Sequence, residues 1–125
     1  MDFSFPFDRA LSDRLISAAN AVNEQSGAAR PVMTAGVYGV TQGPRLETAA
    51  EIQKMRRDGC DIVGMTAMPE AVLAREAGIT YGLIALSVNW AAGILPSEVT
   101  MEEIEAELAD GHQFLRRVLS IIIDY

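Results

Sequence analysis

Three polar parts of the chain carry residue types that bind small anions or heterocyclic rings: residues 42–48, residues 65–66 and Asn89. Thr66 combines a hydroxyl with the free backbone amides expected at a helix start, and such a set of donors favours a phosphate. Glu47 supplies a carboxylate that accepts hydrogen bonds, and the side-chain amide of Asn89 both donates and accepts them. Together these residue types suit recognition of an anion and of a polar ring.

Each of these residues also suits a purely structural role. Thr66 has the chemistry of a helix N-cap, and Glu47 stands next to a predicted helix start, where a carboxylate interacts favourably with the helix dipole. Asn89 interrupts an apolar segment, where a buried amide left unpaired costs about 1 to 3 kcal/mol. It therefore either braces a loop or binds a ligand. The residue types alone leave both interpretations open.

The remaining reactive side chains favour structural roles. His112 has no Asp, Ser or Cys partner at a spacing typical of nucleophilic catalysis. The single Cys60, beside Gly59, is typical of a small core residue. One histidine and one cysteine provide no clustered set of zinc ligands and no internal disulfide, so we expect no metal site.

Hydrophobic spacing predicts the elements that position these residues. Helices are expected from about 11 to 22, from 48 to near 59, from near 69 to 78 and from 100 onward, and strands over 32–40, 61–65 and 81–90. Thr48 followed by Glu51 has the spacing of a capping box. The nearly continuous apolar run at 81–90 is typical of a central strand covered on both faces. This order predicts an α/β fold with a largely buried sheet, built as a single domain over residues 1–125.

Each polar part follows the end of a predicted strand. In open α/β sheets, ligands bind in the crevice beyond the carboxyl ends of the strands. This topology therefore nominates Glu47, Thr66 and Asn89 as candidate ligand-binding residues.

Charge and composition exclude several classes of function. The chain of 125 residues has 17 acidic and 10 basic side chains, for a formal net charge of −7, which repels phosphate backbones and anionic membranes. We therefore expect no nucleic-acid and no membrane partner. Asp2 stands where a secretory signal needs positive charge, so a cytoplasmic location is expected.

Several short motifs occur in a fixed order between Gly36 and Gly93. They are GVY at 36–38, QGPRLET at 42–48, GCDIVGMT at 59–66, MPEA at 68–71, LARE at 73–76 and SVN at 87–89. In these motifs the chain resembles the purine nucleoside phosphorylase and methylthioadenosine phosphorylase family, whose C-terminal portion it matches. The resemblance implies the C-terminal half of that family's α/β/α fold, with a mixed, largely buried sheet flanked by helices.

The resemblance also implies phosphorolysis of a purine nucleoside. Phosphate attacks the anomeric carbon of ribose while the bond to N9 of the base breaks, which yields free base and ribose 1-phosphate. Inorganic phosphate is the co-substrate, no redox cofactor or metal takes part, and the family's usual assembly implies a homo-oligomer, a trimer. Because the transition state resembles an oxocarbenium ion, an anion beneath the sugar and stabilisation of the departing base contribute most to catalysis.

The motif positions imply a role for each residue. Thr66 matches the phosphate-contacting hydroxyl, Met65 the methionine that packs on ribose, and Leu46 the residue that covers the base, which is usually Phe in relatives. Glu47 matches the carboxylate that accepts a hydrogen bond from N1 of 6-oxopurines, and Asn89 matches the catalytic, base-reading position near N7. An Asn amide can donate to O6 and still accept from a protonated N7, so this pair favours hypoxanthine or guanine over adenine. The wording TQGPRLET at 41–48, with VNWAAG at 88–93, is most similar to the methylthioinosine branch of the family.

Members of this family are about twice as long as this chain. Their N-terminal portion supplies a glycine-rich phosphate loop and the Arg and His of the phosphate and sugar sites, which have no counterpart in this sequence. One hypothesis is therefore a phosphorylase for 6-oxopurine nucleosides such as methylthioinosine that needs a companion N-terminal portion. The other is a non-catalytic module of the same fold that binds a nucleobase or mediates oligomerisation. The mass in solution discriminates between them, because large exposed apolar patches are uncommon on monomers.

Overall fold

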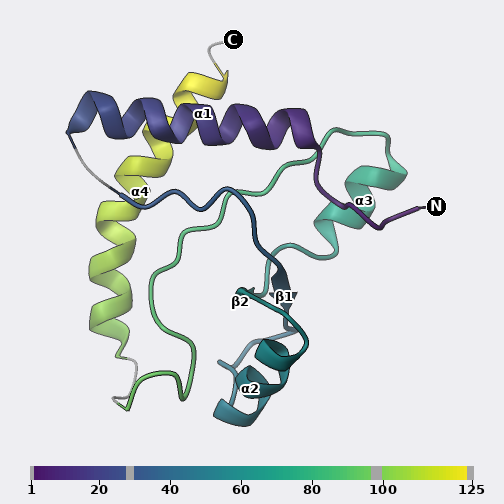
Figure 1. The fold of residues 1–125 in the computed structure, drawn as a ribbon, viewed down its shortest axis with the longest axis vertical. Coiled ribbons are helices and arrows are strands. Elements are labelled where there is room, and N and C mark those ends of the chain that lie inside the picture. The colour runs from purple at the N-terminus through teal and green to yellow at the C-terminus, as the bar shows by residue number, and fades with distance from the viewer. Residues whose placement is uncertain (1, 28–29, 97–99, 124–125) are drawn as a thin grey trace.

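The structure is a computed structural model, and it describes residues 2–27, 30–96 and 100–123. Helices and strands alternate along these residues up to the third helix, which a fourth helix follows in the order of elements (Figure 1). Their bounds are α1 (Arg9–Ser26), β1 (Tyr38–Val40), α2 (Ala49–Arg57), β2 (Ile62–Gly64), α3 (Glu70–Glu76) and α4 (Met101–Ile123). The predicted α/β class is confirmed, and a helix is present at each place where one is predicted.

Local capping residues determine where the first two helices begin. The Asp8 carboxylate accepts a hydrogen bond from the backbone N–H of Leu11 at 2.7 Å, which satisfies a free amide at the start of α1. Gly27 ends α1 with a φ of 64°, a left-handed conformation that glycine adopts readily. At α2 the predicted capping box is confirmed. Thr48 Oγ1 accepts from the N–H of Glu51 at 3.3 Å, and the Glu51 carboxylate accepts from the N–H of Thr48 at 2.7 Å.

The hydrophobic core cluster joins α1 to α4, which cross at a steep angle in Figure 1. Its buried members are at most 3% exposed: Ala18, Ala19, Val22 and Val118. Half-buried apolar side chains surround them: Val32, Ile84, Phe114, Ile121 and Ile122. Because burial of apolar surface is the dominant favourable contribution to folding, this helix pair is the main source of stability.

Residues 81–88 differ from their prediction as a central strand. They are extended, but they form no ladder with a strand in the described part of the chain. They contact two helices instead: a Cβ at Gly82 would lie 2.9 Å from Cγ of Leu11 on α1, and the side chain of Leu86 lies against Gly111 on α4. The strand prediction for 81–90 is therefore wrong. This apolar run packs against α1 and α4 instead of along an edge of the β1 and β2 pair, so no ladder forms.

β1 and β2 form a parallel pair whose register runs from Tyr38 opposite Ile62 to Val40 opposite Gly64. Each strand has three residues, fewer than the predicted ranges, and α2 connects the two strands and buries Ile52. In the part of the chain that the structure describes, the sheet is smaller and less buried than the expected mixed sheet. Val40 and Ile62 are 40% and 39% exposed. The parallel pair nevertheless positions the site, because both carboxyl ends lie at the same edge.

Candidate functional site

The carboxyl ends of β1 and β2 bring together two of the three polar parts. The backbone N–H of Thr41 donates to the C=O of Gly64 at 2.9 Å, so the loop after β1 starts beside the residues that follow β2. The side chain of Met65 lies against Gly43, where a Cβ would be only 2.7 Å from Met65 Sδ. Gly43 also has a φ of 69°, which favours glycine. Residues 42–48 and 65–66 therefore meet at one edge of the sheet, where the parallel topology places them.

Glu47 is a half-buried carboxylate between the exposed residues Leu46 and Thr48. Oγ1 of Thr41 donates to Oε1 of Glu47 at 2.6 Å, a short charge-assisted hydrogen bond. The second oxygen, Oε2, has no hydrogen bond or ion pair with any residue that the structure describes. Such an oxygen is free to accept a hydrogen bond from a ligand N–H. Leu46, the position expected to cover the base, is 56% exposed.

Arg45 is directed toward the start of α2. Its guanidinium donates to both carboxylate oxygens of Glu51, at 2.9 and 2.8 Å. These hydrogen bonds, followed by those from Thr48, lower the pKa of Glu51 from 4.5 to about 2, because they favour the charged form. The pairing joins the loop to the helix start, and no described cation forms an ion pair with Glu47.

Thr66 is exposed, and its hydroxyl lies 3.4 Å from the hydroxyl of Tyr38. The alternative interpretation of Thr66 as a helix N-cap is wrong, because α3 begins at Glu70 with Pro69 at the N-cap. For the same reason, Thr66 lacks the free backbone amides of a helix start that were expected to bind a phosphate with it. Thr66 therefore offers an exposed hydroxyl beside a tyrosine hydroxyl.

Asn89 departs from its expected environment. Its side chain is exposed, and Nδ2 donates to the C=O of Trp90 at 2.8 Å. The expectation of an amide at the end of a buried central strand is therefore wrong, and no hydrogen bond joins Asn89 to the other candidate site residues. The segment that follows Asn89 nevertheless comes close to the start of α2. Gly93 lies so near Ala49 that a Cβ added at Gly93 would stand 2.5 Å from the Cβ of Ala49.

Two residues at this edge are absent from the sequence-based candidates. Thr41 stands six residues before Glu47, a spacing that matches neither helix nor strand periodicity. Tyr38 reaches Thr66 across Gly64, where a Cβ would overlap the tyrosine hydroxyl. Gly64 is the sequence signal for the approach of Tyr38, because it leaves space for the tyrosine hydroxyl, whereas Thr41 carries no such signal.

The other reactive side chains lie apart from this edge or pack within the fold. His112 is exposed on α4. Cys60 is half-buried with a free thiol, and its Sγ lies 3.0 Å from where a Cβ at Gly39 would stand.

Among the described residues, no group of three or more acidic, His or Cys side chains could hold a metal ion. Within the same residues, no helix has the length and apolar character needed to cross a membrane.

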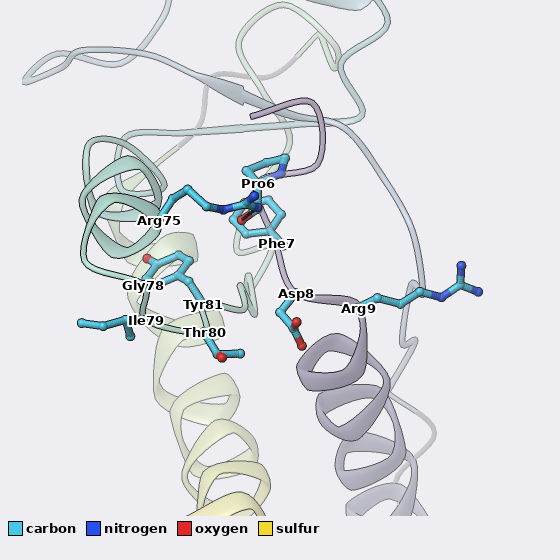
Figure 2. A pocket seen from close by; sticks show the side chains of 9 residues that line it. All are labelled: Pro6, Phe7, Asp8, Arg9, Arg75, Gly78, Ile79, Thr80 and Tyr81. Carbon is cyan, nitrogen blue, oxygen red and sulfur yellow. Dashed lines mark hydrogen bonds between the residues drawn. The ribbon is translucent and has the colours of Figure 1, made fainter. Parts of the chain in front are cut away.

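A separate cavity of about 360 Å³ lies between the N-terminal segment, the end of α3 and Tyr81 (Figure 2). Its lining residues are Pro6, Phe7, Asp8, Arg9, Arg75, Gly78, Ile79, Thr80 and Tyr81. Figure 2 shows Arg75 reaching toward Pro6 and Phe7, and its guanidinium donates to the C=O of Phe5 at 2.6 Å. The backbone N–H of Asp8 donates to the C=O of Tyr81 at 2.8 Å. These contacts join the N-terminal segment to α3 and to the residues that follow it, and none of the candidate site residues lines this cavity.

Comparison with known proteins shows a match along nearly the whole chain. Residues 2–124 match the family model described as the phosphorylase superfamily. The chain is 50% identical over 123 residues to a probable S-methyl-5′-thioinosine phosphorylase from Pseudomonas syringae pv. tomato, covering 98% of this chain and 48% of the relative. It is 37% identical over 125 residues to a probable 6-oxopurine nucleoside phosphorylase from Thermococcus kodakarensis, covering 100% of this chain and 45% of the relative. The chain thus spans about half the length of these curated relatives.

Solved structures of similar fold belong to the same class of enzymes as these relatives. The fold is similar to methylthioadenosine phosphorylase from Schistosoma mansoni in complex with adenine, with a TM-score of 0.86 and 27% identity over 97% of this chain and 46% of that chain. It is also similar to a Schistosoma purine nucleoside phosphorylase in complex with hypoxanthine, with a TM-score of 0.73 and 31% identity over 98% of this chain and 42% of that chain. Sequence and fold agree over nearly the whole chain, and on that ground it belongs to the phosphorylase superfamily.

Proposed function

We propose that the chain provides the base-recognition side of a purine nucleoside phosphorylase for 6-oxopurine nucleosides, S-methyl-5′-thioinosine or a related nucleoside. The observation that carries this proposal is the half-buried Glu47 carboxylate, whose Oε2 has no partner among the described residues, at the same sheet edge as Met65 and Thr66. A 6-oxopurine carries an N1–H that Oε2 can accept, whereas N1 of a 6-aminopurine is itself an acceptor. The names of the relatives support the same substrate class.

In the proposed reaction, an oxygen of inorganic phosphate forms a bond to C1′ as the bond from C1′ to N9 breaks. The bonding electron pair leaves with the base, which takes up at N7, by way of solvent, the proton that hydrogen phosphate gives up on becoming the sugar phosphate ester. Thr66 donates its hydroxyl to the phosphate, Met65 packs against the ribose, and Leu46 covers the base. Asn89 exchanges its hydrogen bond to Trp90 for the base, donating to O6 and accepting from N7–H. No metal or redox cofactor takes part in this scheme.

We assign most of the phosphate site to a companion N-terminal portion. In this chain Arg45, close to the sheet edge, is already engaged by Glu51. Preorganised stabilisation of developing charge is commonly the largest single term in catalysis. The isolated chain is therefore expected to turn over very slowly or not at all, and activity is expected to require either the companion portion or assembly into a homo-oligomer.

A second candidate function is a non-catalytic module that associates with another polypeptide. Exposed apolar side chains favour it: Val40 and Ile62 on the sheet are 40% and 39% exposed, and Trp90 is 63% exposed. The outer edges of the β1 and β2 pair also have no strand partner in the described part of the chain. Free edges and apolar patches of this kind promote association.

Phosphate-dependent release of hypoxanthine from methylthioinosine and inosine tests the proposal. The purified chain is assayed alone and after mixing with a separately expressed N-terminal portion of a relative, with and without phosphate. We expect turnover only in the mixture with phosphate, and loss of turnover in Asn89→Ala but not in the control Asn20→Ala, whose side chain is exposed on α1. Hypoxanthine binding without turnover in any mixture would support the non-catalytic module instead.

A further inference from the structure

The hydroxyl of Thr41 is the one partner that the described residues give to the Glu47 carboxylate. The distance from Thr41 Oγ1 to Glu47 Oε1 is 2.6 Å, and both side chains are half-buried within a loop that is otherwise mostly exposed. A glutamate side chain has several rotatable bonds, and its carboxylate presents two oxygens that accept in different directions. The Thr41 hydroxyl selects one of these oxygens and leaves the other free.

Thr41 is itself fixed by the sheet. Its backbone N–H donates to the C=O of Gly64, the last residue of β2, at 2.9 Å. Gly64 is followed directly by Met65 and Thr66. One residue therefore connects the Glu47 side chain to the backbone that carries the proposed ribose and phosphate contacts.

The neighbouring cation does not perform this task. Arg45 stands two residues before Glu47, but its guanidinium donates to both carboxylate oxygens of Glu51 and to the C=O of Leu46. The Glu47 carboxylate is consequently oriented by a neutral hydroxyl and keeps its negative charge unpaired by any described cation. An arrangement that fixes one acceptor oxygen without neutralising it suits recognition of a ligand N–H.

We propose that Thr41 is a positioning residue for the purine base: it holds Oε1 of Glu47 so that Oε2 faces the N1–H of a 6-oxopurine. This inference rests on the proposed function. Groups whose orientation is fixed before binding lose less freedom when the ligand arrives. Because a 6-aminopurine has no N1–H, the Thr41 hydroxyl contributes to binding of hypoxanthine and not to binding of adenine.

Equilibrium titration of the full chain with hypoxanthine and with adenine tests this role. The variants are Thr41→Val, which keeps the branched shape but removes the hydroxyl, Thr41→Ser, which keeps the hydroxyl, and Glu47→Ala. Thr34→Val is the matched control, since Thr34 is exposed in the segment before β1. Thermal unfolding of each variant reports whether it folds as the unmodified chain does.

Thr41→Val is expected to weaken hypoxanthine binding about tenfold while adenine binding stays the same, and Thr41→Ser is expected to stay within about threefold of the unmodified chain. Equal weakening for both bases, or failure of Ser to restore binding, would indicate a purely structural role and overturn the inference. If Glu47→Ala loses the preference for hypoxanthine but Thr41→Val keeps it, the positioning role fails and the proposed function stands. If the unmodified chain shows no preference for hypoxanthine, the proposed function fails and the positioning role fails with it.

Discussion

The α1–α4 pair and the β1–α2–β2 unit are held together by different interactions. Val22 on α1 and Val118 on α4 are 1% and 0% exposed, inside a cluster of apolar side chains. The two strands have three residues each, and Val40 and Ile62 on them are about two-fifths exposed. At the sheet edge, polar contacts such as that from Thr41 to Glu47 replace apolar packing.

This difference separates stability from recognition. The helix pair supplies the buried apolar surface that a folded chain requires, while the sheet edge carries a carboxylate with an open acceptor position. Polar groups that remain available to a ligand are poor contributors to stability, because they are not fully paired within the protein. Substitutions in the helix pair are therefore expected to change stability most, and substitutions at the sheet edge are expected to change ligand binding most.

Val118→Ala tests the stabilising region and has the largest expected effect. Removing two buried methyl groups, with the cavity they leave, is expected to lower the free energy of unfolding by about 2.5 kcal/mol. Chemical denaturation measures this change, and the hypoxanthine affinity of the folded protein is expected to stay the same. Ile123→Ala is the control on the same helix, because Ile123 is 75% exposed. Equal losses for the two variants would contradict the assignment of the core.

Glu47→Ala tests the recognition region. Loss of a hydrogen bond to a charged group is expected to weaken hypoxanthine binding by about 2 kcal/mol, or about 30-fold, while the free energy of unfolding falls by only about 1 kcal/mol through loss of the hydrogen bond from Thr41. Titration calorimetry and denaturation measure the two quantities. Glu105→Ala on the exposed face of α4 is the matched control. An unchanged affinity would remove Glu47 from the base site.

Asn89→Asp sharpens the assignment of base preference. An ionised carboxylate accepts from a 6-amino group but does not donate to a 6-carbonyl. In the chain combined with its companion portion, the ratio of kcat/KM for methylthioinosine to that for methylthioadenosine is expected to fall about tenfold. Asn20→Asp on α1 controls for the added charge. The same ratio in Asn89→Asp and in the unmodified protein would exclude Asn89 from reading the base.

Glu51→Gln has the smallest expected effect, which is a change in how the stability of the folded chain depends on pH. Hydrogen bonds from Arg45, followed by those from Thr48, lower the pKa of Glu51 from 4.5 to about 2 in the folded chain. Above pH 4.5 the carboxylate is ionised in both folded and unfolded chains, so its contribution to stability is fully present. As the pH falls from 4.5 toward 2, the unfolded chain binds the proton first and the contribution is lost.

Urea denaturation at a series of pH values measures this contribution. The unmodified chain is expected to lose more stability than Glu51→Gln as the pH falls through this window. Because the pair is exposed, solvent screens it and the difference is small. Parallel pH profiles for the two proteins would show that the pairing contributes nothing to the loop that holds Glu47.

Local interactions explain what could be predicted of the fold. Thr48 and Glu51 are three residues apart and satisfy each other's backbone amides, so their spacing alone indicates the start of α2. Gly27 likewise ends α1 through its own φ. The meeting of residues 42–48 with Met65 was predictable as well, because parallel strands place their carboxyl ends at one edge.

Only the tertiary structure decided the features that depend on distant partners. The apolar run at 81–90 has the composition of a central strand, but among the described residues it pairs with neither outer edge of the β1 and β2 pair and contacts α1 and α4 instead. Asn89 is consequently exposed. Thr41 and Glu47 meet because the loop turns at Gly43, a contact that no periodicity encodes. The sequence by itself determined the helix starts and the residue types at the sheet edge, since these depend on near neighbours, whereas pairing and burial depend on parts of the chain that are far apart in sequence.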